Sequence, residues 1–183
     1  MRGVIILCSF FFIVFVIALS WDSKPAVLII GGEDSVGSWM SGVLLVISCT
    51  LSAVIASKRK WYPWILFSIF FILLAIDENF MIHEAIKRWI IFTNFEKTNE
   101  PVYWIGEIPV VVAACFGAVV AGVMWKHTER DFRWLIITGG LAGTASVAID
   151  VLSLGVIWED SLKLLGELAV TSLLVLESQN KNE

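Results

Sequence analysis

About six long apolar stretches, separated by short polar segments, make up most of this chain. Most of them contain the roughly 20 residues that a helix needs to cross about 30 Å of hydrocarbon. The pattern therefore predicts an all-α fold, a polytopic membrane helix bundle of about six transmembrane helices that forms a single domain over residues 1–183. The predicted segments run over about 3–20, 36–57, 61–88, 102–125, 134–157 and 158–177.

The first and last segments each have a second interpretation. The first segment also has the features of a cleaved signal peptide, namely Arg2, an apolar run and the sequence Ala18-Leu19-Ser20 with a small residue at each end. We expect this segment to be retained as a membrane helix. The last segment carries Lys163 and Glu167, so it could lie on the membrane surface as an amphipathic helix. Because residues 168–176 continue apolar, a sixth span is the preferred interpretation.

Composition supports a membrane protein and excludes several other classes. The chain is 58% hydrophobic and has a mean hydropathy of +0.84, so the lipid bilayer is its expected partner. The net charge is −4, without a polybasic tail, and no nucleic-acid partner is expected. There is no C-x-x-C-H haem motif and no phosphate-binding loop, so neither haem nor a nucleotide is expected as cofactor. The three cysteines sit singly in apolar segments and are expected to be small hydrophobic residues.

Basic residues between the segments predict the orientation. Lys58, Arg59 and Lys60 separate segments two and three, and Lys126 and Arg130 separate segments four and five. By the positive-inside rule, these loops and both termini face the cytoplasm, which predicts a multi-pass protein of the plasma (inner) membrane. The nine tryptophans lie at or near predicted segment ends, as expected of aromatic belts at the headgroup level.

Ionisable residues inside the segments are the strongest functional signal. Residues 77–84 read D-E-N-F-M-I-H-E and close an apolar run. Charges near hydrocarbon pair with one another, line a cavity or bind an ion. At 1.5 Å per residue, Asp77 and Asp150 lie about 24 Å from the cytoplasmic ends of their helices, and Glu107 and Glu167 lie about 9 and 12 Å inward from the outer side. Four helices are therefore expected to bring a carboxylate to the outer half of the membrane.

A metal ion is the leading explanation for this grouping. Carboxylates with one imidazole suit iron, manganese, zinc or calcium, and helix bundles build carboxylate metal sites from facing helices. We therefore expect a divalent metal site. Such a site could catalyse a reaction on a lipid-like substrate that enters from the bilayer. No catalytic residue is assigned. The candidate ligands are Asp77, Glu78, His83, Glu84, Glu107, Asp150 and Glu167.

Helical phase and nearby cations favour a more ordinary role for some of these groups. At 100° per residue, Asp77 and Glu84 share a face, whereas His83 points about 120° away from Asp77. One helix therefore cannot direct all its ionisable groups at one point. Acids at the start of the last segment can also act as helix caps. Basic residues that can pair with the acids near the interface are Lys87, Arg88 and Lys163.

The D-E-x4-H-E pattern of residues 77–84 resembles one found in uncharacterised bacterial multi-pass membrane proteins. The resemblance covers this octet and the later acids around Glu159 and Glu167, and it implies no activity. Alkaline ceramidase-like hydrolases, which bind zinc in a membrane bundle, are a second comparison. They need several intramembrane histidines, whereas this chain has His83 and, in a cytoplasmic loop, His127. This difference argues against a zinc lipid amidase.

Two further classes of function remain open. The same acids could form a proton or cation pathway, which requires a polar route to the cytoplasmic side; the candidates for it are Ser68, Thr138 and Ser146. The hydroxyls of segment two, Ser48, Thr50 and Ser52, are expected to bond to carbonyls of their own helix. Alternatively, the protein is a structural or accessory subunit of a membrane complex.

Small residues suggest where helices approach closely. Ala113, Gly117 and Ala121 recur at four-residue intervals in segment four, and Gly139 and Gly143 form a G-x-x-x-G in segment five. Such stripes let helix backbones come together in lipid. We expect segments four and five to pack on each other, the alternative being a homo-oligomer or a protein partner that binds these faces.

Overall fold

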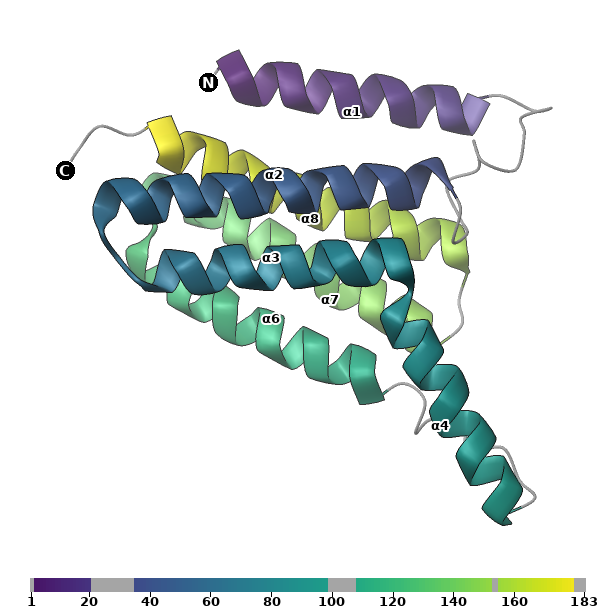
Figure 1. Ribbon diagram of the computed structural model, residues 1–183. Helices are drawn as coiled ribbons and strands as arrows, with labels where there is room; N and C mark the ends of the chain where they lie inside the picture. The colour runs from purple at the N-terminus through teal and green to yellow at the C-terminus, as the bar shows by residue number, and fades with distance from the viewer. Residues whose placement is uncertain (1, 21–34, 99–107, 153–154, 180–183) are drawn as a thin grey trace.

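The computed structural model describes residues 2–20, 35–98, 108–152 and 155–179. These residues form seven α-helices and one short 3-10 helix, and the all-α helical bundle is confirmed (Figure 1). The helices are α1 (Arg2–Ser20), α2 (Val36–Arg59), α3 (Pro63–Phe80), α4 (Ile82–Thr98), α6 (Ile108–His127), η2 (Arg130–Phe132), α7 (Arg133–Val151) and α8 (Val156–Gln179).

Local sequence sets the ends of the α2–α3 hairpin. The Ser35 hydroxyl accepts a hydrogen bond from the Ser38 N–H at 3.2 Å and caps α2. At the other end, Lys60 adopts a left-handed conformation, with φ 48°. Pro63 then occupies the first turn of α3, where its fixed φ fits and its missing N–H costs nothing. The result is a tight turn between two long antiparallel helices (Figure 1).

The apolar run predicted as one segment over 61–88 divides into two helices. The break is at Met81, which has φ 51° and donates its N–H to the Asp77 carbonyl at 2.7 Å. This closes α3, and α4 leaves the bundle at an angle to it (Figure 1). No glycine or proline marks the break in the sequence, so periodicity alone did not reveal it.

The core forms where α8 packs between α2 and α7. Trp64 and Phe67 of α3 meet edge to face, with ring centroids 5.3 Å apart, and Leu173 and Leu174 of α8 are fully buried in the same cluster. Trp64, expected at the headgroup level, is instead part of this core, since it is only 1% exposed. Aromatic area buried in this way stabilises the bundle from within.

Two glycines bring the backbones of α7 and α8 close together. A Cβ on Gly139 would lie 3.2 Å from the Gly166 carbonyl oxygen, and a Cβ on Gly166 would lie 3.1 Å from the Gly139 carbonyl oxygen. Gly117 of α6 lies against Phe70 of α3. Segments four and five do pack on each other as expected, since α6 contacts α7, but these glycines contact α3 and α8.

Within the described residues, four helical stretches are long and apolar enough to cross a membrane. They are Val36–Arg59, Pro63–Phe80, Ile108–His127 and Arg130–Val151. Membrane association is therefore supported by length and composition. The long helix α8 has a different character, because its charged residues lie along a side that packs into the bundle.

Candidate functional site

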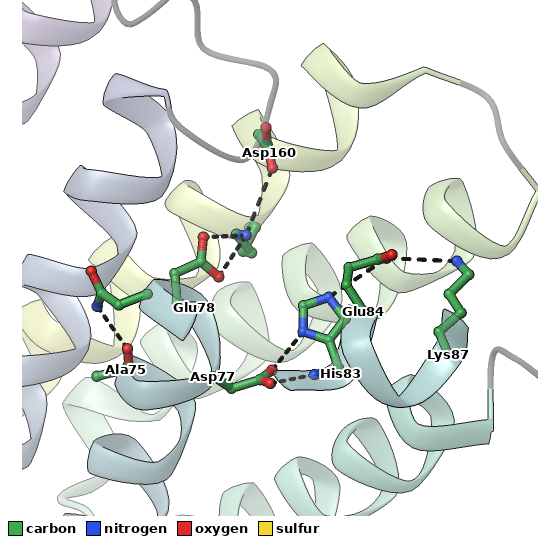
Figure 2. A network of polar contacts seen from close by, with 9 residues as sticks. Ala75, Asp77, Glu78, His83, Glu84, Lys87 and Asp160 are labelled. Atoms are coloured by element: carbon green, nitrogen blue, oxygen red, sulfur yellow. Dashed lines mark hydrogen bonds and ion pairs between the residues drawn. The ribbon is translucent and has the colours of Figure 1, made fainter. Parts of the chain in front are cut away.

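Asp77 organises the junction between α3 and α4. Its Oδ1 accepts the backbone N–H of His83 at 2.8 Å, and its Oδ2 lies 2.8 Å from the Nδ1 of the His83 ring (Figure 2). The first bond satisfies one of the free N–H groups in the first turn of α4, as an N-cap does. Asp77 therefore holds the direction of α4 as well as the imidazole.

Two more charged groups complete this junction. Glu84 Oε1 lies 3.9 Å from the Nε2 of His83 and 3.8 Å from the Nζ of Lys87. The hydrogen bond that His83 donates to Asp77 raises the pKa of His83, and the nearby carboxylates act in the same direction against the opposing effect of burial. We call Asp77, His83, Glu84 and Lys87 the α3–α4 corner (Figure 2).

Lys163 of α8 reaches across to α3. Its Nζ lies 2.9 Å from both carboxylate oxygens of Glu78 and 3.7 Å from Asp160 Oδ1 (Figure 2). The predicted pairing of Lys163 with these acids is confirmed. An ammonium in this position supplies the positive charge that a bound cation would otherwise provide.

Glu167 lies one helical turn beyond Lys163 and faces α2. Its Oε1 accepts a hydrogen bond from the Ser41 hydroxyl at 2.7 Å. Its Oε2 is buried and has no hydrogen-bond partner among the described residues. Most buried polar atoms in proteins are paired, so this half-satisfied carboxylate calls for an explanation.

Hydroxyl groups continue this polar interface along α2 and α8. Ser48 Oγ and Thr171 Oγ1 lie 2.8 Å apart, and Thr171 donates to the Glu167 carbonyl at 2.8 Å. Ser48 was expected to bond within its own helix; it bonds across the interface instead, whereas Thr50 does bond to the Val46 carbonyl. The buried Ser52 hydroxyl has no hydrogen-bond partner within the part of the chain that the structure describes.

An ion pair closes the interface at its other end. Arg59 Nη2 lies 2.7 Å from Glu177 Oε2, and Glu177 Oε1 accepts the N–H of Glu129 at 3.1 Å. The Glu177 side chain is fully buried. We call the whole interface the α2–α8 seam; it comprises Ser41, Ser48, Ser52 and Arg59 of α2 with Lys163, Glu167, Thr171 and Glu177 of α8.

The predicted metal ligands fall into separate groups. Asp77, His83 and Glu84 meet at the corner, while Glu78 and Glu167 belong to the surroundings of α8. Asp150 is half-buried near the end of α7, and Glu107 lies outside the described residues. Among those that are described, no group of three or more His, Cys, Asp or Glu side chains is arranged to hold a metal ion.

Sequence reasoning missed most of the seam. It weighed only carboxylates by depth, so segment two, which brings none, was set aside. The signal was nevertheless present: Ser41, Ser48, Ser52 and Arg59 are spaced by seven, four and seven residues, which keeps them on one helical face. Glu167 and Thr171 share the facing side of α8 at a four-residue interval.

The seam has the chemistry of a proton relay. A carboxyl group accepts or donates according to its protonation state, and a serine or threonine hydroxyl does both at once. The corner, by contrast, consists of charged groups near the surface whose contacts are local. The two clusters therefore support different roles.

The comparisons with known proteins identify a family without assigning an activity. A family model described as "Domain of unknown function (DUF8692)" matches residues 4–177. No curated protein matches the chain, and no solved structure does.

Proposed function

We propose that this chain, which belongs to the DUF8692 family, is an integral membrane protein that passes protons along the α2–α8 seam, with Glu167 as the central proton carrier. The observation that carries the proposal is the Glu167 carboxylate, held by Ser41 through one oxygen and unpartnered at the other among the described residues. Ionisable side chains inside membrane bundles commonly mark proton or ion routes.

The geometry around Glu167 suits alternate donation and acceptance. Ser41 donates to Oε1, which leaves Oε2 as the atom that can take up a proton. Thr171 Oγ1 lies within hydrogen-bond distance of the Glu167 carbonyl and of Ser48 Oγ, and either hydroxyl can donate in the Ser48–Thr171 pair. These hydroxyls meet the backbone of Glu167 and not its carboxylate, so a proton would pass between them and the carboxylate through water.

The seam has charged groups at both of its ends. Asp160 and Glu177 are 17 residues apart on α8, which corresponds to about 26 Å, close to the thickness of the hydrocarbon core. Lys163 and its carboxylates stand at one end, and the Arg59–Glu177 pair stands at the other. A pathway also requires that protons can pass between these two ends.

An apolar barrier lies between Thr171 and Glu177. Ile55 of α2 and Leu174 of α8 are buried there, at 1% and 0% exposure. Among the described seam residues, only Ser52 places a hydroxyl or carboxyl group in this stretch. Proton transfer across the stretch therefore requires transient water. We therefore expect slow, gated proton transfer rather than an open channel.

The proposal includes a specific topology. Six spans in the plasma (inner) membrane, with both termini cytoplasmic, account for the basic residues that gather where α2 meets α3 and where α6 meets α7, namely Lys58, Arg59, Lys60, Lys126, Arg130 and Arg133. Tags at the two ends of the chain should then be accessible from the same side as a label at residue 60. A tag accessible from the opposite side would refute this topology.

Proton flux into proteoliposomes tests the proposal. A potassium diffusion potential drives protons inward, and a trapped pH-sensitive dye reports their arrival. We expect the parent protein to carry protons faster than protein-free liposomes and Glu167→Gln to reduce that flux by about tenfold or more, since proton-transfer groups typically contribute factors of this size.

The matched control is Glu84→Gln, the same substitution at the α3–α4 corner, which should leave the flux unchanged. Thermal unfolding of each variant separates lost function from lost structure. The proposal fails if the parent shows no flux above the liposome background. It also fails if Glu167→Gln carries protons normally; reduced stability without a change in flux would indicate the structural or accessory subunit.

A metal-dependent activity on a lipid-like substrate is the second candidate. It is favoured by the imidazole of His83, which lies between the carboxylates of Asp77 and Glu84 at 2.8 and 3.9 Å. Imidazole and carboxylate are ligand types that suit iron, manganese, zinc or calcium. Elemental analysis of the purified protein beside Asp77→Ala/Asp150→Ala tests it; less than about a tenth of an equivalent of metal would reject this candidate.

A further inference from the structure

The helix α4 exposes apolar side chains that a helix in water would bury. Among its described side chains, the large hydrophobic ones that are exposed are Trp89 and Phe92, at 66% and 61%, and Ile82 and Ile86, at 43% and 40%. At 100° per residue, Ile82, Ile86 and Trp89 fall within about 60° of one another. They form a continuous apolar stripe that no other described helix covers.

Three ionisable side chains of α4 are only partly exposed, whereas Arg88 is exposed. His83, Glu84 and Lys87 have 33%, 29% and 21% of their side-chain surface exposed, and they belong to the corner and its contacts with α3 (Figure 2). A helix in water buries its apolar side. An exposed apolar stripe therefore indicates that the surroundings of α4 are apolar along that stripe.

The position of α4 identifies those surroundings. It begins directly after Phe80, where the candidate span α3 ends. The outer surface of α3 is itself apolar up to that point, with Leu73 and Phe80 58% and 74% exposed. The stripe of α4 therefore continues a surface that faces lipid. It adds Trp89 and the exposed Arg88, residue types that favour the headgroup layer.

We propose that α4 lies in the boundary between headgroups and acyl chains of the leaflet at which α3 ends. The stripe of Ile82, Ile86 and Trp89 faces the acyl chains, and Arg88 reaches the lipid phosphates. Asp77 anchors the first turn of α4 through the His83 N–H and so fixes which side of the helix meets the lipid. This inference concerns the membrane surface and does not depend on proton transfer through the seam.

Site-directed spin labelling in liposomes tests this arrangement. Cys8, Cys49 and Cys115 are first replaced by alanine, and nitroxides are then attached to Ile86→Cys, Trp89→Cys and Lys87→Cys in separate proteins. Oxygen concentrates in the acyl region, whereas a nickel chelate stays in water. We expect oxygen to relax the labels at 86 and 89 more strongly than nickel does, and the label at 87, which lies in the corner, to be less accessible to oxygen than either of them.

Two results would overturn the proposal. Strong nickel accessibility at 86 and 89 would mean that α4 projects into water. Exclusion of both reagents together with dipolar broadening between labels would mean that a second copy of the chain covers the stripe. Positions 86 and 89 lie on the same stripe, so their labels should give the same result. A melting temperature equal to that of the cysteine-free protein confirms that each variant is folded.

Discussion

The α3–α4 corner and the α2–α8 seam use the same residue types in opposite surroundings. The side chains of Asp77 and Glu84 remain 31% and 29% exposed, whereas the side chain of Glu177 is fully buried. The corner joins residues that lie within ten positions of one another, but the Ser41–Glu167 bond spans 126 positions. A local cluster can form as soon as its turn forms, while the seam exists only in the complete bundle.

Because of this difference in burial, mutations in the corner and mutations in the seam should have different effects on stability. Partly exposed ion pairs contribute little, because water and salt screen them and their side chains lose entropy. A buried charge that loses its partner is strongly destabilising, since no solvent replaces the lost interaction. Substitutions in the seam should therefore disturb the whole protein, and substitutions in the corner should act on α4.

The largest effect is expected when Arg59→Leu leaves Glu177 buried without its ion-pair partner. We expect a loss of about 3–5 kcal/mol in the free energy of unfolding, the range for broken buried pairs. The corner control, Lys87→Leu, removes the partner of Glu84 and should cost about 1 kcal/mol or less. Unfolding in mixed detergent micelles, followed by circular dichroism, measures both. Equal losses would show that burial does not distinguish the two regions.

A smaller effect is expected where α7 supports the seam. A Cβ at Gly139 would lie 2.9 Å from Val170 Cγ2 and 3.2 Å from the Gly166 carbonyl oxygen, next to Glu167 in the chain. Because valine is stiff and the carbonyl is backbone, Gly139→Ala should force α7 and α8 apart and cost about 1–3 kcal/mol.

The adjacent substitution Gly140→Ala is a matched control. Its Cβ would meet nothing within 4 Å, and it gains the same helix propensity. The difference between the two melting temperatures thus isolates the contact with α8. If Gly139→Ala were as stable as Gly140→Ala, the close approach of α7 and α8 would be refuted.

The helices could be predicted from the sequence more readily than the contacts between them. Apolar runs of membrane length predict α2, α3, α6 and α7. A backbone in the hydrocarbon core must satisfy its hydrogen bonds internally, so such runs form helices. The pairing of Lys163 with Glu78 and Asp160 could also be predicted from the sequence, since few basic residues lie near these acids. In contrast, the break at Met81 depends on the Asp77–His83 contacts, and no residue type marks it.

The seam shows why a site can escape a search by residue type. Depth along each helix singled out Glu167 as a candidate, but it could not identify Ser41 as its hydrogen-bond partner. Pairing across an interface depends on how the helices rotate about their axes, which is set by the packing around Gly139, Gly166 and Leu173. The spacing of the α2 serines would have indicated one face but not the helix it meets.

The smallest expected effect belongs to His83, and it tests whether the corner acts locally. Its folded-state pKa is raised above the ordinary value of 6.5 by Asp77. The stabilisation from its charged form is therefore fully present below pH 6.5 and is lost as the pH rises through the raised pKa. We expect the hydrogen-exchange protection of the first turn of α4 to fall over that range by less than about 1 kcal/mol, given the partial exposure of the ring. In His83→Gln this dependence of the first turn of α4 should disappear, because glutamine keeps a hydrogen-bonding side chain but does not titrate. A slope of the same size that persists in the variant would mean that a group other than His83 controls the first turn of α4.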